Sequence, residues 1–318
     1  MPSFLSLTRA DLWETYQQFL DRTATQGIPG VLTLDTQQPG PEVGIMACTH
    51  GNEPAGLAAF RYLLHYQEAL VKGRLHLILN NIEAARRYFT EATDLSFTAH
   101  YRLVDRDMNR LKPGWQSDGT YESQRVQQLL PLLERLDVVL DLHSTSAPSD
   151  PMLIEISESA QDFQVPGVAL LIQNIVPHLN APPLVSLCTG ASAYVLETGS
   201  HEDQSALYIA QAAVQTLLQN AGMWGAEAEP RQKNMTPLTP YRIYQTVVFP
   251  HESYRLTEIV PHLSFLPAGK VLAYSETEDK ATWPDWVVER DSYAIMPPQR
   301  LKPVHFGSEF MYLAEKQP

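Results

Sequence analysis

Two histidines and one glutamate stand at the ends of apolar runs, with a spacing that suits a metal ion. The run from Ile45 to Cys48 is followed by His50, and Glu53 comes three residues later. A second apolar run, Asp137 to Leu142, ends at His143. Two imidazoles and one carboxylate are a common donor set of catalytic zinc sites, in which a fourth position stays open. The sequence therefore predicts one zinc ion per subunit, bound by His50, Glu53 and His143.

A further carboxylate, Glu197, follows the apolar run Tyr194 to Leu196 and precedes a turn at Gly199. Hydrolysis of an amide requires a group that takes a proton from water and passes it to the leaving amine. Glu197 is the candidate for this general base. Taken singly, it also fits an ordinary strand-end glutamate, and His50 with Glu53 also fits local contacts at a helix N-terminus.

Basic residues gather in segment 84–120, where weak periodicity predicts a long irregular loop. Long loops inside compact domains are usually functional. Arg102 and Arg110, with Asn109 beside them, could grip a carboxylate through bidentate hydrogen bonds and polarise a carbonyl group. A solvated loop, in which these arginines pair with Asp105 and Asp107, is an equal alternative.

The elements that must position these side chains alternate between strand and helix. Apolar periodicity predicts helices over 8–24, 54–66, 122–136, 165–179 and 204–220, and strands over 31–35, 43–48, 74–80, 137–142, 152–156 and 194–199. This alternation is typical of an α/β fold with a mixed, mostly parallel sheet flanked by helices. Ligands bind such folds at the carboxyl edge of the strands, which is where His50, His143 and Glu197 are expected.

The character of the sequence changes near residue 225. Segment 221–237 is rich in Gly, Pro and polar residues, which indicates a linker. Strands are then predicted over 241–249, 270–275, 292–295 and 301–313, with no helix between them. We therefore expect a catalytic domain over residues 1–225 and a smaller, mostly β domain over residues 226–318.

Composition excludes several kinds of partner. The net charge is −13, from 36 acidic and 23 basic residues among 318, which argues against nucleic-acid binding because that binding depends on clustered Lys and Arg. The chain has neither an apolar run of membrane-spanning length nor a signal-peptide pattern, so we expect a cytoplasmic protein without a membrane partner. Cys48 and Cys188 lie in apolar runs and are expected to be free core thiols. A homo-oligomer is compatible with the sequence.

Together these residues resemble the succinylglutamate desuccinylase/aspartoacylase family, zinc amidohydrolases with a zinc-carboxypeptidase fold and a C-terminal β domain. The matching segments span nearly the whole chain in the family's order: Thr49-His50-Gly51-Asn52-Glu53, Arg102, Asp107-Met108-Asn109-Arg110, Asp141-Leu142-His143 and Glu197-x-Gly199. The resemblance implies that zinc is held by His50, Glu53 and His143, and that Glu197 activates the water. It also implies that Arg102 stabilises the oxyanion, that Asn109 and Arg110 hold the carboxylate of the released amino acid, and that Tyr312 contacts the substrate.

The resemblance implies hydrolysis of a small-molecule N-acyl amino acid, with one departure from the family. Relatives that remove acyl groups with a distal carboxylate tend to carry an arginine shortly before the catalytic glutamate, whereas Val185 to Val195 contains no basic residue. The acyl specificity therefore stays open. Two other functions share the same residues: a metallocarboxypeptidase that acts on peptides, and a non-catalytic, metal-dependent carboxylate-binding protein. The latter would have no need of Glu197.

Overall fold

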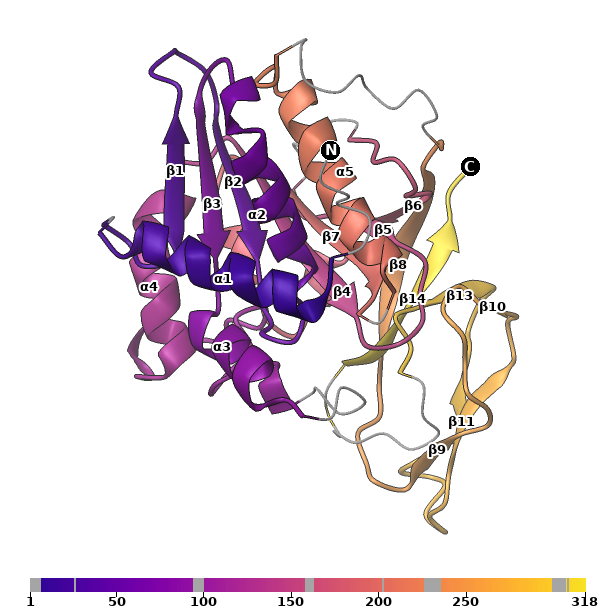
Figure 1. Cartoon of the computed structure of the whole chain (residues 1–318). Coiled ribbons are helices and arrows are strands. Elements are labelled where there is room, and N and C mark those ends of the chain that lie inside the picture. Colours follow the sequence, from indigo (N-terminus) through magenta and orange to yellow (C-terminus); the bar gives the residue numbers. More distant parts are fainter. Residues whose placement is uncertain are drawn as a thin grey trace.

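The computed structural model describes residues 7–25, 27–93, 100–157, 163–201, 203–225, 236–298, 307 and 309–318. Its helices are α1 (Arg9–Thr23), α2 (Ala55–His65), α3 (Ile82–Glu91), α4 (Tyr121–Leu133) and α5 (Ser205–Asn220). Its strands are β1 (Val31–Asp35), β2 (Glu42–Ala47), β3 (Arg74–Leu79), β4 (Val138–Thr145), β5 (Met152–Glu155), β6 (Leu170–Gln173), β7 (Ser192–Ser200), β8 (Thr239–Val248), β9 (Tyr254–Leu256), β10 (Phe265–Leu266), β11 (Val271–Ser275), β12 (Trp286–Val287), β13 (Ser292–Ile295) and β14 (Glu309–Lys316). Figure 1 shows their arrangement.

Most strands join one sheet of eleven, in the order β1-β3-β2-β4-β7-β5-β6-β8-β14-β13-β10. The central strands β3, β2, β4 and β7 are parallel to one another, whereas β1 and β5 pair antiparallel with their neighbours β3 and β7. The far end, β8-β14-β13-β10, is antiparallel. This confirms the predicted mixed sheet with a mostly parallel centre.

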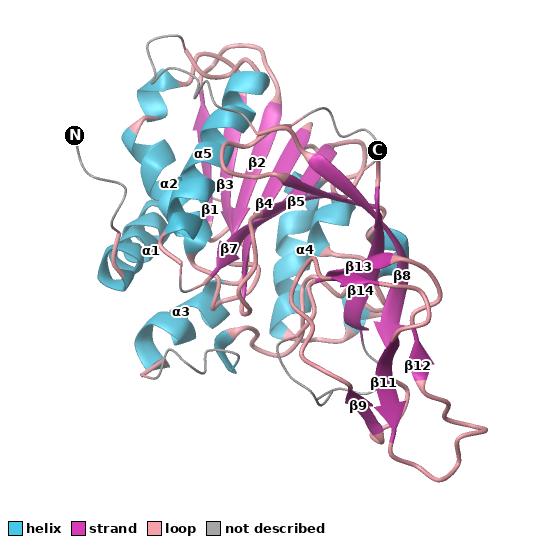
Figure 2. Ribbon diagram, turned by 90° about the vertical axis from the view of Figure 1, so that its right-hand side faces the viewer, coloured by secondary structure: helices cyan, strands magenta, loops and turns pink. Residues whose placement is uncertain are grey.

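Helices cover both faces of the parallel part of the sheet. Helices α1, α2 and α5 lie on one face and α4 lies on the other (Figure 2). Each helix buries an apolar stripe: Phe19 of α1 packs on Phe60 of α2 with ring centroids 4.8 Å apart, and Val126 and Leu129 of α4 are fully buried. The central strands are thus covered on both sides, which explains why their sequences are nearly continuous apolar runs.

The C-terminal strands have a core of their own but share the large sheet. Strands β9, β11 and β12 form a separate small sheet, and Phe249, Leu256 and Leu272 are among the residues buried against it. Strand β8, however, pairs in parallel with β6, so the large sheet runs unbroken into the C-terminal region. The domain boundary near residue 225 stays a prediction, and residues 226–235 of the expected linker lie outside the described residues.

Two predicted elements are wrong. Segment 165–179, expected to be a helix, contains the short strand β6 and then a single 3-10 turn at Val176–His178. A brief apolar run buried inside a sheet cannot be told from a helix by periodicity. The loop expected over 84–120 begins with helix α3, whose N-cap Asn81 accepts a hydrogen bond from the Ala84 amide. Two arginines counted with the loop lie on this helix, where Arg86 and Arg87 both pair with Glu83.

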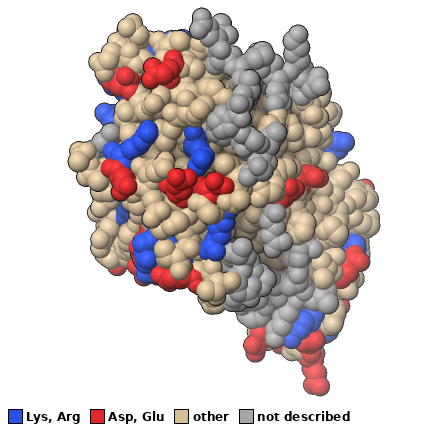
Figure 3. Space-filling view, in the orientation of Figure 1, with Lys and Arg blue, Asp and Glu red and all other residues tan. Residues whose placement is uncertain are grey.

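The cysteines, the helices and the surface charges bear on further expectations from the sequence. Cys48 and Cys188 are buried and free. Within the described ranges no helix combines the length and apolar character needed to cross a membrane. On the face displayed in Figure 3, acidic and basic side chains are interspersed rather than segregated, and the exclusion of nucleic acid stays a prediction.

The backbone around Gly51 allows no side chain. A Cβ atom at Gly51 would lie 2.2 Å from the Ala84 carbonyl carbon and 2.4 Å from the Tyr101 oxygen, both backbone atoms. We expect Gly51→Ala to lower the free energy of unfolding by about 1–3 kcal/mol, the usual result of overpacking a rigid site, measured by urea denaturation. Gly27→Ala is the control, because nothing lies within 4 Å of its Cβ position. Equal stability of the two variants would contradict this packing.

Candidate metal centre and active site

His50 and Glu53 lie on the tight turn between β2 and α2. The chain leaves β2 through Cys48, which adopts a positive φ of 53°. The Gly51 amide then donates to the Arg102 carbonyl at 3.0 Å, and the Glu53 amide donates to the His50 carbonyl at 3.1 Å. This turn fixes both side chains at the carboxyl edge of the sheet, where the sequence predicted them.

His143 and Glu197 come from the two neighbouring strands. Strand β4 lies beside β2 in parallel, and β7 lies beside β4. His143 stands opposite Glu197 in the register of β4 and β7. Because parallel strands bring their carboxyl ends to one edge, residues far apart in sequence converge here.

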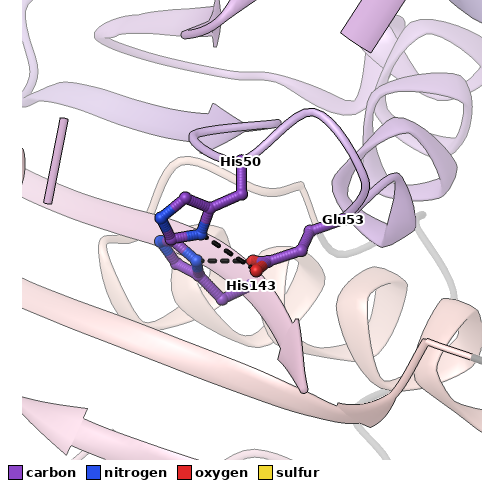
Figure 4. Close-up of side chains that lie close together, drawn as sticks. All are labelled: His50, Glu53 and His143. Atoms are coloured by element: carbon purple, nitrogen blue, oxygen red, sulfur yellow. Dashed lines mark hydrogen bonds and ion pairs between the residues drawn. The ribbon is translucent and has the colours of Figure 1, made fainter. Parts of the chain in front are cut away.

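The three predicted ligands form one buried cluster (Figure 4). His50 Nδ1 lies 2.9 Å from Glu53 Oε1, and His143 Nδ1 lies 2.7 Å from Glu53 Oε2. Each residue offers one ligand atom, and these atoms all lie within 4.8 Å of one another. All three residues are only 2% exposed. Both Nδ1 atoms therefore face the same carboxylate inside the protein.

The opposite nitrogen of each ring contacts another carboxylate. His50 Nε2 lies 3.0 Å from Asp107 Oδ1, and His143 Nε2 lies 3.0 Å from Asp141 Oδ2. Asp141 is itself held by the Thr49 hydroxyl, which donates to Oδ1 at 2.8 Å. A carboxylate at Nε2 keeps the proton there and turns the Nδ1 lone pair toward a metal, as is usual for histidine ligands.

Electrostatics of the cluster favour a cation. Burial alone would raise the pKa of Glu53, but His50, His143 and Arg102 outweigh it and hold that pKa well below its ordinary value. Burial also opposes ionisation of Asp107, yet His50 and Arg102 lower its pKa strongly. These carboxylates are therefore ionised, and buried negative charge requires compensation by protons or by a metal.

The donor set fits a divalent metal such as zinc. His50 Nδ1 is shielded from solvent and makes no hydrogen bond among the described residues, although a carboxylate oxygen lies 2.9 Å away. A lone pair facing a carboxylate oxygen is repulsive unless a cation lies between them. Two nitrogens and one carboxylate oxygen are the ligands that zinc prefers when its fourth position is left for substrate.

Glu197 and Arg102 line a cavity at this cluster. Its volume is about 230 Å³, and Glu53 also lines it. Burial raises the pKa of Glu197 to about 7, so near neutral pH this carboxyl can both accept and release a proton. Arg102 Nη1 donates to Glu53 Oε1 at 2.6 Å, which places its guanidinium beside the candidate metal site.

The described lining of this cavity does not include the three predicted substrate-binding residues, Asn109, Arg110 and Tyr312. Asn109 Nδ2 lies 3.1 Å from His143 Nε2. The Arg110 guanidinium contacts Tyr312 Oη at 3.3 Å and pairs with Glu309 through Nε at 2.9 Å. The structure thus places Arg110 and Tyr312 in contact and adds Glu309 as the carboxylate that pairs with both, while their contact with substrate stays a prediction.

Two contacts of the site were not anticipated from the sequence. Asp107 was considered as a partner of loop arginines, yet its Oδ1 lies 3.0 Å from His50 Nε2 and accepts a hydrogen bond from the Asn109 amide at 2.8 Å, whereas Arg102 is 3.8 Å away. The sequence around Glu309 does not indicate a role in the site, because its partner Arg110 lies 199 residues earlier in the chain. His201 also approaches the site, because its Nδ1 lies 2.7 Å from the hydroxyl of Ser144, the residue that follows His143 in β4.

The fold and this cluster define an α/β protein with a candidate metal centre at the carboxyl edge of its parallel strands. A family model described as the succinylglutamate desuccinylase/aspartoacylase catalytic domain matches residues 39–220, more than half of the chain. The chain belongs to this family.

Solved structures share the fold over nearly the whole chain. A succinylglutamate desuccinylase from Chromobacterium violaceum aligns with TM-score 0.67 and 19% identity, over 96% of this chain and 98% of that one. A succinylglutamate desuccinylase/aspartoacylase from Rhodobacter sphaeroides aligns with TM-score 0.62 and 18% identity, over 92% and 89%. The product-bound ectoine utilization protein EutE (DoeB) from Ruegeria pomeroyi aligns with TM-score 0.59 and 18% identity, over 89% and 88%. No curated protein matches the chain.

Asp107 should matter for metal affinity although it is not one of the three candidate ligands. We expect Asp107→Asn to weaken zinc binding about 10- to 100-fold, as loss of a carboxylate behind a histidine ligand usually does, measured by competition with a chromophoric chelator. Asp105→Asn is the control, because that carboxylate accepts from the Tyr121 amide at 2.8 Å instead of contacting a histidine. An unchanged affinity in Asp107→Asn would refute the role of the Asp107–His50 contact.

Proposed function

We propose that this chain is a zinc-dependent amidohydrolase that cleaves the amide bond of an N-acyl amino acid to a carboxylate and a free amino acid. The observation that carries the proposal is the position of Glu197, which stands opposite His143 in the strand register and lines the same cavity as Glu53. A protein that only binds carboxylates would have no use for a proton acceptor at this place. Family membership supports the same reaction class.

In this proposal each residue of the site has one task. His50, Glu53 and His143 hold the zinc ion, which when bound lowers the pKa of water to about 7 and polarises a carbonyl group. Glu197, whose pKa burial raises to about 7, takes the proton of the attacking water and returns it to the leaving nitrogen. The Arg102 guanidinium donates hydrogen bonds to the oxygen on which negative charge develops.

Asn109 and Arg110 are proposed to hold the carboxylate of the leaving amino acid. Arg110 Nη1 donates to the Asn109 carbonyl at 2.6 Å, while Nε donates to Glu309. Glu309 thereby fixes the orientation of the guanidinium, and the substrate must use the N–H groups that remain. Tyr312, which donates to Glu309 at 2.9 Å, completes this polar group.

Removal of the proposed base should abolish turnover without loss of metal. We expect Glu197→Gln to lower kcat on an N-acyl amino acid about 100- to 10 000-fold, the usual contribution of a positioned general base, while zinc content by atomic absorption is unchanged. Glu155→Gln on the neighbouring strand β5 is the control, since that carboxylate accepts a hydrogen bond from Gln173. Wild-type kcat in the Glu197 variant would exclude the proposed mechanism.

The role of Arg110 can be separated from general catalysis. We expect Arg110→Ala to reduce kcat/KM for N-acyl amino acids about 10- to 100-fold, which corresponds to the loss of a charge-assisted hydrogen bond, and to affect matched N-acyl amines that lack the carboxylate much less. Arg106→Ala is the control on the same loop, because Arg106 pairs with Asp118 and is exposed. Equal losses on both substrates would contradict carboxylate recognition by Arg110.

A further inference from the structure

Glu122 carries a buried carboxylate that the proposed chemistry does not use. It lies in the first turn of α4 and is only 2% exposed. A carboxylate removed from water is destabilising unless hydrogen-bond donors surround it. The donors that surround Glu122 therefore indicate what this carboxylate does.

Three successive backbone amides donate to this carboxylate. The Val104 amide donates to Oε1 at 2.7 Å, and the amides of Asp105 and Arg106 donate to Oε2, each at 3.0 Å. The side-chain amide of Asn81 also donates to Oε1 at 3.0 Å. Successive amides that converge on one anion form a nest, a backbone arrangement that elsewhere binds phosphate and other external anions. Here the protein supplies the anion itself.

The segment held in this way lies between two residues of the candidate site. Arg102 precedes it, and its Nη1 donates to Glu53 Oε1 at 2.6 Å. Asp107 follows it, and its Oδ1 lies 3.0 Å from His50 Nε2. Neither Arg102 nor Asp107 belongs to a helix or a strand. The nest therefore fixes the backbone where regular secondary structure does not.

We infer that Glu122 is a positioning residue of the active site. By holding the amides of residues 104–106 it orients Arg102 at the cavity and Asp107 behind His50. The part that concerns Arg102 rests on the proposed function, whereas the part that concerns Asp107 requires only a metal at the cluster. Without the carboxylate, three amides lose their acceptor and the segment must rearrange to satisfy them, which displaces both side chains.

The test compares Glu122→Gln with the control Thr120→Ala. Glutamine keeps the size of the side chain but places an NH₂ donor where an acceptor oxygen stood. Thr120→Ala removes the N-cap of the same helix, whose hydroxyl accepts from the Ser123 amide at 3.4 Å, and leaves the nest intact. Zinc affinity is measured by competition with a chromophoric chelator, stability by urea denaturation, and kcat and KM on an N-acyl amino acid. Amide hydrogen exchange of segment 103–107 is followed in the zinc-loaded protein.

We expect Glu122→Gln to weaken zinc binding about tenfold, the lower end of the range for groups behind a metal ligand. It should also lower kcat about 10- to 100-fold with little change in KM, as misplacement of a group that acts in the transition state does. Thr120→Ala should lower stability while zinc affinity and kcat stay at wild-type values. The losses of zinc affinity in Glu122→Gln and Asp107→Asn should be less than additive in the double variant, because both act through one contact.

Wild-type zinc affinity and kcat in folded Glu122→Gln would overturn the inference, and so would full additivity with Asp107→Asn. If Glu122→Gln does not fold, exchange in the wild type decides: slow exchange of amides 104–106 supports the nest, and rapid exchange overturns it. If wild type hydrolyses no N-acyl amino acid but Glu122→Gln binds zinc more weakly, the proposed function fails and the positioning of Asp107 stands. If wild type is active and Glu122→Gln matches it in both kcat and zinc affinity, the reverse is true.

Discussion

The buried Glu53 carboxylate, faced by the Nδ1 atoms of His50 and His143, is the interaction on which the candidate site depends. An ionised carboxylate at 2% exposure is stable only when positive charge lies beside it. The surrounding structure orients both rings for that charge. Asp107 contacts Nε2 of His50, and Asp141 contacts Nε2 of His143. Polar groups that would disfavour folding if left alone thus form a cluster that favours a cation.

Much of this site could be predicted because the ends of buried strands can be recognised in the sequence. A buried parallel strand appears as a short apolar run, and the polar residue after it lies at the carboxyl edge of the sheet, as His50 and Glu197 do. The same reasoning failed for β6, whose apolar residues are flanked by prolines and irregular chain, and for α3, where surface arginines concealed a capped helix. For β6 tertiary burial, rather than local pattern, decides the structure, whereas α3 carries a local signal, because Asn81 caps it and Glu83 pairs with Arg86 and Arg87.

Contacts made by residues distant in sequence were beyond such reasoning. Glu309 meets Arg110 only because β14 joins the sheet beside β8, and His262 reaches the cavity only because the C-terminal loops fold against the edge that bears Glu197. The sequence also did not indicate that the sheet continues from β6 to β8, because the change in composition near residue 225 suggested two separate domains. Pairing between strands is set by the whole fold, which no single segment encodes.

The parallel pairing of β6 with β8 has a mechanical consequence. Backbone hydrogen bonds across that ladder tie the C-terminal strands to the same rigid framework that carries the metal ligands. The two sides of the cavity are therefore joined by one continuous sheet, and a hinge between them would have to break backbone hydrogen bonds of that ladder. Accommodation of bulkier molecules would then evolve through the loops that cap the cavity, while the ladder itself stays intact.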